Sequence, residues 1–119
     1  MNVNPILLAA GTAFGLPIYP NVYKGEEGVK KPDDYLTFNY VDERPVVRGD
    51  DGDLYDQTTI QLHEFCKGDP EPKKKPLRNF LRSKGFTVLS TSEFYESDTK
   101  YNHIVVEASI TAAIDDEEV

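Results

Sequence analysis

Apolar and polar residues alternate with a period of two in three separate segments, and this limits the chain to a fold built around a β-sheet. The segments are "YLTFNYVDER" (35–44), "QTTIQLHEFCKG" (57–68) and "NHIVVEASI" (102–110). Alternate side chains of a strand point to the same side, so each segment has one apolar face. The residues that we place on these faces are Leu36, Phe38, Tyr40, Ile60, Leu62, Cys66, Ile104, Val106, Ala108 and Ile110, together with the polar Glu64.

Two further segments read as strands. "IYPNVY" (18–23) is expected at a sheet edge, because Pro20 has no N–H to donate to a ladder. "FTVLSTSEFYE" (86–96) is joined to the last alternating segment by the turn "SDTK" (97–100). Pro45 predicts the end of the strand that begins at residue 35.

The segment "NPILLAAGTAFG" (4–15) predicts a first helix. Asn4 is of the type that caps a helix N-terminus, and Pro5 suits the first helical position. Pro17 predicts that the helix has ended by that residue.

A second helix is predicted to begin near Pro70 or Pro76 and to reach Lys84, with Gly85 after its C-terminus. Its apolar residues recur at helical spacing and predict a buried stripe, while its cations occupy the opposite, solvated side. The stripe consists of Leu77, Phe80 and Leu81.

The expected order of elements is therefore α-β-β-β-α-β-β. Strands that follow one another in hairpin-like succession favour an α+β fold, in which a mainly antiparallel sheet is covered on one face by two helices. The 119 residues are enough for one domain with a real core. We expect that domain over residues 1–110 and a disordered acidic tail over 111–119.

The charge is distributed unevenly along the chain. Its 13 Lys and Arg face 21 Asp and Glu, which gives a net charge of −8. Six of the cations stand between Lys73 and Lys84 without one acid among them, so the rest of the chain carries seven cations against 21 acids. An acidic surface repels phosphates, which argues against nucleic acid as the main partner and against sequence-specific binding. One basic face on an acidic molecule instead suits copies of itself or an acidic neighbour.

Cys66 is the only cysteine, so the chain can form neither an internal disulfide nor a cluster of thiolate ligands. We expect it to be a small buried residue. No basic segment precedes the apolar residues near the N-terminus, and no apolar run approaches the roughly 20 residues that cross a bilayer. The expected setting is a reducing cytoplasm or an assembly made there, with no membrane partner.

The stretch "RGDDGDLYD" (48–56) contains four aspartates and two glycines. An EF-hand needs glycine at its sixth position and glutamate at its twelfth, but counting from Asp51 these positions hold Asp56 and Leu62. A solvated loop is the favoured interpretation. A weak divalent site is left open, with Asp50, Asp51, Asp53 and Asp56 as its ligands.

The sequence offers little support for an enzyme. His63 and His103 each fall on the more polar side of a predicted strand, and a metal site or general base would need converging partners. They could face each other across strands, but their registers cannot be read from the sequence. No phosphate loop, nucleophile elbow or zinc spacing is present, so we expect no catalytic residue, no metal and no cofactor.

The segment "KKKPLRNFLRSKG" (73–85) has three interpretations. It could bind nucleic acid, but its one aromatic residue, Phe80, lies on the stripe that should be buried. It could be an ordinary amphipathic helix with a cationic solvated side. A contact with a second subunit or a partner is the interpretation we favour, because the rest of the surface is so acidic.

The succession of segments resembles the tail-terminator or tail-completion proteins of long-tailed bacteriophages, related to the tail-to-head joining family. The likeness is carried by "YLTFNYVDERPVVRGDDGDLYDQTTIQLHEFCKGDP", "LRNFLRSKGF" and "EFYESDTKYNHIVVEASI". It implies a non-enzymatic virion protein that forms a ring, usually a hexamer, and is assembled in the host cytoplasm. Such a ring caps the tail tube, contacts the tail tube protein and docks to the head-completion or connector protein, without a cofactor.

A ring uses heterologous contacts, in which one patch of a subunit meets a different patch of the next. We hypothesise that the acidic loop meets the basic helix across this boundary, or that the loop faces a partner or the lumen of the ring. The residues of this hypothesis are Asp50, Asp51, Asp53, Asp56, Lys73, Lys74, Lys75, Arg78 and Arg82. Two alternatives stay open: a head-completion or neck protein, and a small acidic cytoplasmic inhibitor that mimics nucleic acid.

Overall fold

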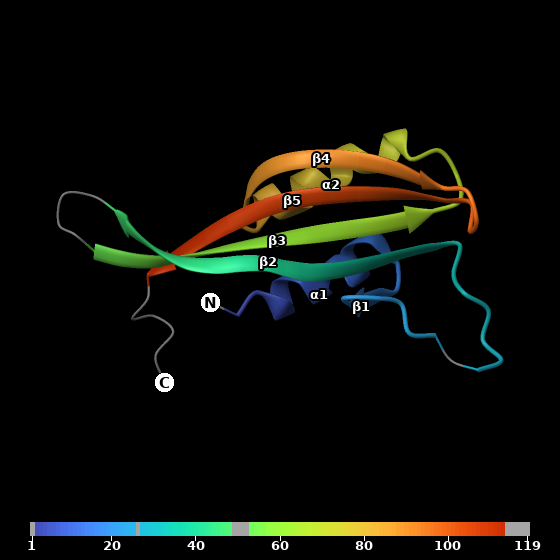
Figure 1. Cartoon of the computed structure of the whole chain (residues 1–119), viewed down its shortest axis with the longest axis horizontal. Coiled ribbons are helices and arrows are strands. Elements are labelled where there is room, and N and C mark those ends of the chain that lie inside the picture. Colours follow the sequence, from blue (N-terminus) through green and yellow to red (C-terminus); the bar gives the residue numbers. More distant parts are fainter. Residues whose placement is uncertain (1, 26, 49–52, 114–119) are drawn as a thin grey trace.

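The computed structural model describes residues 2–25, 27–48 and 53–113. In that part of the chain, two helices and a five-stranded sheet follow the order α-β-β-β-α-β-β, which confirms the α+β fold. The spatial order of the strands is β1-β2-β3-β5-β4, and every pair is antiparallel except β1 with β2. Figure 1 shows the strands as one twisted layer with both helices behind it.

The strands are longer than the alternation alone predicts. Their bounds are β1 Ile18–Pro20, β2 Asp34–Arg48, β3 Asp53–Cys66, β4 Thr87–Glu96 and β5 Tyr101–Ala113. Because β5 continues to Ala113, the folded domain extends beyond residue 110, and residues 114–119 of the expected tail lie outside the described residues.

The prediction that Pro45 ends its strand is wrong, because β2 continues through it to Arg48. The parallel strand β1 pairs only with residues Leu36 to Phe38, so β2 is an edge strand where Pro45 stands. A missing N–H costs no ladder bond at an outer edge. A bulge between Tyr40 and Asp42 also changes the faces, since it shifts the register by one residue.

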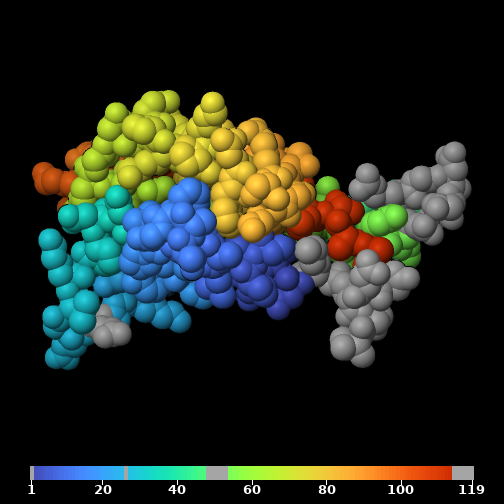
Figure 2. Space-filling view, turned by 180° about the vertical axis from the view of Figure 1, so that it is seen from behind, coloured from blue at the N-terminus to red at the C-terminus, as the bar shows by residue number. Residues whose placement is uncertain are grey.

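The helices cover one face of the sheet, which we call the covered face. α1 spans Asn4–Phe14 and α2 spans Glu71–Ser83, and Phe14 packs against Phe80 at 5.7 Å between ring centroids. Figure 2 shows the two helices side by side on this face. The buried apolar core between helices and sheet contains Val3, Leu7, Ala10, Leu36, Phe38, Ile60, Leu62, Leu77, Leu81, Phe86, Ile104, Val106, Ala108 and Ile110.

Tyr40 is the member of the predicted apolar face that stays exposed, at 42%. It lies beside the start of α1, where its hydroxyl accepts a hydrogen bond from the backbone N–H of Val3. The polar end of the ring therefore stays near solvent while its edge meets the helix.

The N-terminus of α1 differs from the prediction. Asn4 is the first helical residue rather than the cap, and its N–H donates to Oδ1 of Asn2 at 3.0 Å. At the other terminus Gly15 adopts a left-handed conformation with φ 66°. Within the helix Gly11 is required by packing, because a Cβ there would lie 2.7 Å from Cγ2 of Ile18.

The first of the two proposed starts of α2 is correct, since its N-cap is Pro70 and Pro76 lies inside the helix. The chain leaves the helix through Gly85, whose φ is 95°. The N–H of Phe86 returns to the carbonyl of Leu81, which closes the helix end and buries Phe86.

Candidate interaction surface

The far end of the β2–β3 hairpin projects from the body of the molecule. We call residues 44–48 and 53–57 the arm; its strands pair from Arg44 opposite Gln57 to Arg48 opposite Asp53. Strand β5 supports only its base, because Ala113 is the last residue of β5 and pairs with Tyr55. Figure 1 shows the arm extending beyond both helices in a molecule 53 Å long and 29 Å wide.

Apolar side chains of the arm are exposed. Val47 and Leu54 form a cross-strand pair and are 67% and 52% exposed. An isolated two-stranded ribbon is at best marginally stable in water. An arm that carries such a pair gains stability when another surface covers it.

The expected aspartate loop is largely part of this arm. Asp53 begins β3, and Asp56 is half-buried opposite Pro45, so these positions belong to a strand rather than to a loop. Asp50 and Asp51 lie outside the described residues. The weak divalent site that the sequence left open therefore cannot be assembled from described side chains alone.

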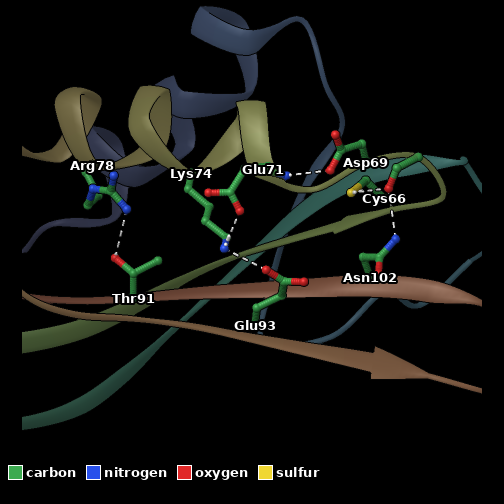
Figure 3. A network of polar contacts seen from close by, with 9 residues as sticks. Cys66, Asp69, Glu71, Lys74, Arg78, Thr91, Glu93 and Asn102 are labelled. Carbon is green, nitrogen blue, oxygen red and sulfur yellow. Dashed lines mark hydrogen bonds and ion pairs between the residues drawn. The ribbon is translucent and has the colours of Figure 1, made fainter.

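Two of the candidate cations on α2 serve the fold itself. Nζ of Lys73 lies 3.3 Å from Asp34 and 3.7 Å from Glu64, both on the sheet beneath it. Lys74 contacts Glu71 at 2.9 Å and Glu93 at 2.6 Å, so it ties the helix to β4 (Figure 3). These ion pairs hold α2 on the covered face.

Arg78 is also turned toward the sheet, where its Nη1 donates to Oγ1 of Thr91 at 3.4 Å (Figure 3). Lys75 and Arg82 are exposed, and no carboxylate of the described residues lies within 4.0 Å of either. Lys84 is exposed beside them, with its Nζ over the ring of Phe80. Within the basic segment 73–84, the cations available to a partner are therefore Lys75, Arg82 and Lys84.

Glu64 is the buried acid of the covered face, with 4% of the residue exposed. Burial raises its pKa to about 7, although Lys73 acts in the opposite direction. The alternation places Glu64 on this face, but nothing in the sequence identifies its partner 9 residues further along, on a helix. Cys66 is buried as expected, and burial raises the pKa of its thiol to about 11, so it is a poor nucleophile.

The opposite face of the sheet, which we call the open face, has neither of the two helices on it. Part of it is covered by the segment before β2, where Nζ of Lys31 lies 4.8 Å from the ring centroid of Tyr101. Tyr35 stacks on Phe65 beneath this segment, at 4.8 Å between centroids. The sequence did not predict this cluster of Tyr35, Phe65 and Tyr101. Its members lie on the more polar side of their strands, where their same-side neighbours along the strand are polar.

The two histidines meet on this open face. Nδ1 of His63 lies 2.7 Å from Nε2 of His103, and Nε2 of His63 lies 2.6 Å from Oδ1 of Asn39. The sequence left open whether the two rings face each other; the structure brings them together, because the register of β3 with β5 places Phe65 opposite His103 and so brings His63 beside it. No group of three or more His, Cys, Asp and Glu side chains converges as metal ligands within the described ranges.

Where the sheet twists at the base of the arm, the open face is hollowed. This open hollow has a volume of about 450 Å³. It is lined by Val46, Gln57, Thr87, Leu89, Ser109 and Thr111. Its lining residues are hydroxyl, amide and aliphatic, and none of them is charged.

Comparison with known proteins adds no identity to these features. The chain matches no family model, and no curated protein matches it. No helix in the described part of the chain is both long and apolar enough to cross a membrane.

Proposed function

We propose that this protein is a structural subunit of virion assembly, a tail terminator or tail-completion protein of a long-tailed bacteriophage. In this proposal copies of the chain form a ring, with a hexamer expected, which caps the tail tube and docks it to the head connector. Its partners are the tail tube protein and the connector, and its place is the head–tail junction of the virion. It acts by assembly and not by catalysis.

The observation that carries the proposal is the separation of the arm from the free cations of α2. The arm lies at one end of the long axis, whereas α2 packs over the body (Figure 1). Within the described part of one copy, Asp56 on the arm forms no ion pair with α2, whose lysines Lys73 and Lys74 pair with acids of the body instead. Two complementary patches that do not meet within a subunit can meet between subunits, and repetition of such a heterologous contact closes a ring.

Compared with the interface predicted from sequence, the revised one loses the cations Lys73, Lys74 and Arg78, which contact the sheet or its edge acids, and gains Lys84. Lys75, Arg82 and Lys84 would face Asp53 and Asp56 on the arm of the next copy, while Lys73 and Lys74 stay in their internal ion pairs. The exposed pair Val47 and Leu54 would be buried in the same contact. Apolar burial supplies affinity, and the charges select the partner surface and speed association.

The test is a charge reversal with a matched control. In Lys75→Glu/Arg82→Glu the ring should be lost, because like charges then face each other across the boundary. The control Lys24→Glu/Lys30→Glu reverses the same charge on exposed residues outside α2. Light scattering after size exclusion measures the oligomer, both for the subunit alone and after incubation with purified tail tubes.

A second variant, Asp53→Lys/Asp56→Lys, reverses the arm. Each reversed variant should fail alone, and a mixture of the two should recover heterologous pairs by cross-linking. Rings that form equally well in all variants would contradict the proposed interface. Binding to connectors but not to tube ends would instead identify a neck protein, and a persistent monomer that binds a basic enzyme would favour the inhibitor.

A further inference from the structure

A row of polar side chains crosses four strands of the open face. It begins with Asn39 on β2, continues through His63 on β3 and His103 on β5, and ends with Glu96 on β4. The successive distances are 2.6 Å, 2.7 Å and 3.6 Å, the last between Nδ1 of His103 and Oε2 of Glu96. The row joins strands that are far apart in the sequence, and nothing in the ring proposal requires it.

The hydrogen bonds of this row define the tautomers of both rings. Nδ2 of Asn39 faces Oε1 of Gln61 and the carbonyl of Tyr40, so Oδ1 of Asn39 is left as the acceptor toward His63. Nε2 of His63 must therefore carry a hydrogen. A neutral imidazole has one donor and one acceptor, so Nδ1 of His63 accepts and Nε2 of His103 donates.

The same reasoning locates the next proton. In the neutral pair, Nδ1 of His103 is the one ring nitrogen that is neither donating nor accepting a hydrogen bond within the row. It faces the carboxylate of Glu96. A proton added there converts a loose contact into an ion pair and keeps the bond from His103 to His63 intact.

A second proton has a different effect. It can enter only at Nδ1 of His63, which is the acceptor of the bond between the rings. Two N–H groups would then point at each other, and two positive rings would stand in direct contact. The rings must separate, and β3 and β5 lose a side-chain connection between them.

We propose that His103 and His63 form a two-step proton clasp, in which the first proton draws Glu96 on β4 toward His103 and the second parts the two rings. The ligand of this site is the proton itself. The clasp would tighten the β4–β5 end of the open face in mild acid and release it in stronger acid. It goes beyond the proposed function, and it can be measured on a monomer or on a ring.

The surroundings of the rings favour this order of protonation. Burial, and then the neighbouring ring of His103, lower the pKa of His63 to about 4. Burial also lowers the pKa of His103, but Glu96 opposes that effect. The ionisable side chains that share the open face in the described part of the chain are Tyr19 on β1, Tyr35, Asp42 and Arg44 on β2, Tyr55 on β3, Glu96 on β4, and Tyr101 and Glu107 on β5. Tyr23 packs against Tyr35, and Lys31 and Lys67 lie over the ring of Tyr101.

Among these groups of the described residues, Glu96 is the carboxylate that contacts an imidazole. Glu107 instead accepts a hydrogen bond from Nε2 of Gln61 at 3.0 Å. The two acids therefore provide a matched pair of variants. Glu96→Gln removes the negative charge that would pair with protonated His103. Glu107→Gln removes an equal charge from the same face, from a side chain that contacts neither imidazole ring.

Long-range nitrogen–proton NMR of the imidazoles, recorded as the pH falls from 8 to 3.5, tests the clasp in the intact chain. At the start both rings should show the Nε2–H tautomer. His103 should then titrate at higher pH than His63. Glu96→Gln should move the titration of His103 to lower pH, and Glu107→Gln should move it much less.

A third variant separates the two steps. In His63→Gln the side-chain oxygen can still accept from Nε2 of His103, so the first step should remain while the second disappears. An Nδ1–H tautomer in either neutral ring would overturn the clasp. So would titration of His63 before His103, or equal shifts in the two glutamate variants.

Discussion

The covered and open faces of the sheet bury ionisable groups of opposite kind at adjacent positions of β3. His63 points to the open face and meets His103, whereas Glu64 points to the covered face and meets Lys73. On both faces burial favours the neutral form, so it lowers the pKa of His63 to about 4 and raises that of Glu64 to about 7. Burial alone therefore does not determine whether stability rises or falls with pH. The direction depends on whether the buried group is an acid or a base.

The two groups make opposite contributions to stability over nearly the same range of pH. For His63 the folded pKa lies below the ordinary 6.5, so its contribution is lost as the pH falls from about 6.5 to about 4. For Glu64 the folded pKa lies above the ordinary 4.5, so its contribution is lost as the pH rises from about 4.5 to about 7. The whole protein should therefore show a flatter pH dependence of stability than either group alone produces.

The largest expected difference between the faces is in packing. Leu62→Ala on the covered face removes a fully buried side chain beneath the helices and should lower the free energy of unfolding by about 3 kcal/mol. Val105→Ala lies on the open face, is half-buried and should cost about 1 kcal/mol. Urea unfolding, with both midpoint and slope, measures the two values. Equal losses would show that the open face is as tightly packed as the covered one.

Next in size is the loss of the buried ion pair on the covered face. Lys73→Met leaves Glu64 buried without its cation and should cost about 2 kcal/mol or more at pH 8. At pH 5 the carboxyl of Glu64 is protonated in the folded state, so the loss should be much smaller. Lys75→Met, which changes an exposed lysine of the same helix, should have little effect at either pH. A loss for Lys73→Met that does not depend on pH would contradict the role given to Glu64.

The smallest expected effect belongs to the open face and is best seen once its counterpart has been removed. In a Glu64→Gln background the protein should lose about 1–2 kcal/mol as the pH falls from 6.5 to 4, because the unfolded chain takes up the proton that buried His63 resists. Adding His63→Gln should remove most of that slope. Thermal unfolding across the pH series measures both proteins, and an unchanged slope would place the proton uptake elsewhere.

Much of the fold can be read from the chain, because strand faces and helix stripes are local patterns. The period of two places Ile60, Leu62 and Glu64 on one side, and the structure buries all three. Predictions from local sequence fail where tertiary packing changes the free-energy cost of a residue. Pro45 is tolerated because β2 is an edge there, and Asn2 rather than Asn4 provides the side-chain oxygen at the start of α1.

The sequence predicts that the candidate surface is basic, but it does not predict which cations of α2 belong to it. A run of cations marks α2 as basic, yet only the packing of the helix shows that Lys73 and Lys74 face acids of the same chain while Lys75 and Arg82 do not. Side chains one or two positions apart on a helix point in directions that differ by 100° or more. Their use therefore depends on how the helix is rotated on the sheet.

Residue order alone is enough to specify the layers of this molecule: which residues are apolar together, where helices end, and that charge is segregated. Pairing between distant strands decided the rest. Register is set by the global fit of one buried face, and a shift by one residue would reverse every side chain of a strand. For that reason the meeting of His63 with His103, and of Glu64 with Lys73, came into view only with the assembled sheet.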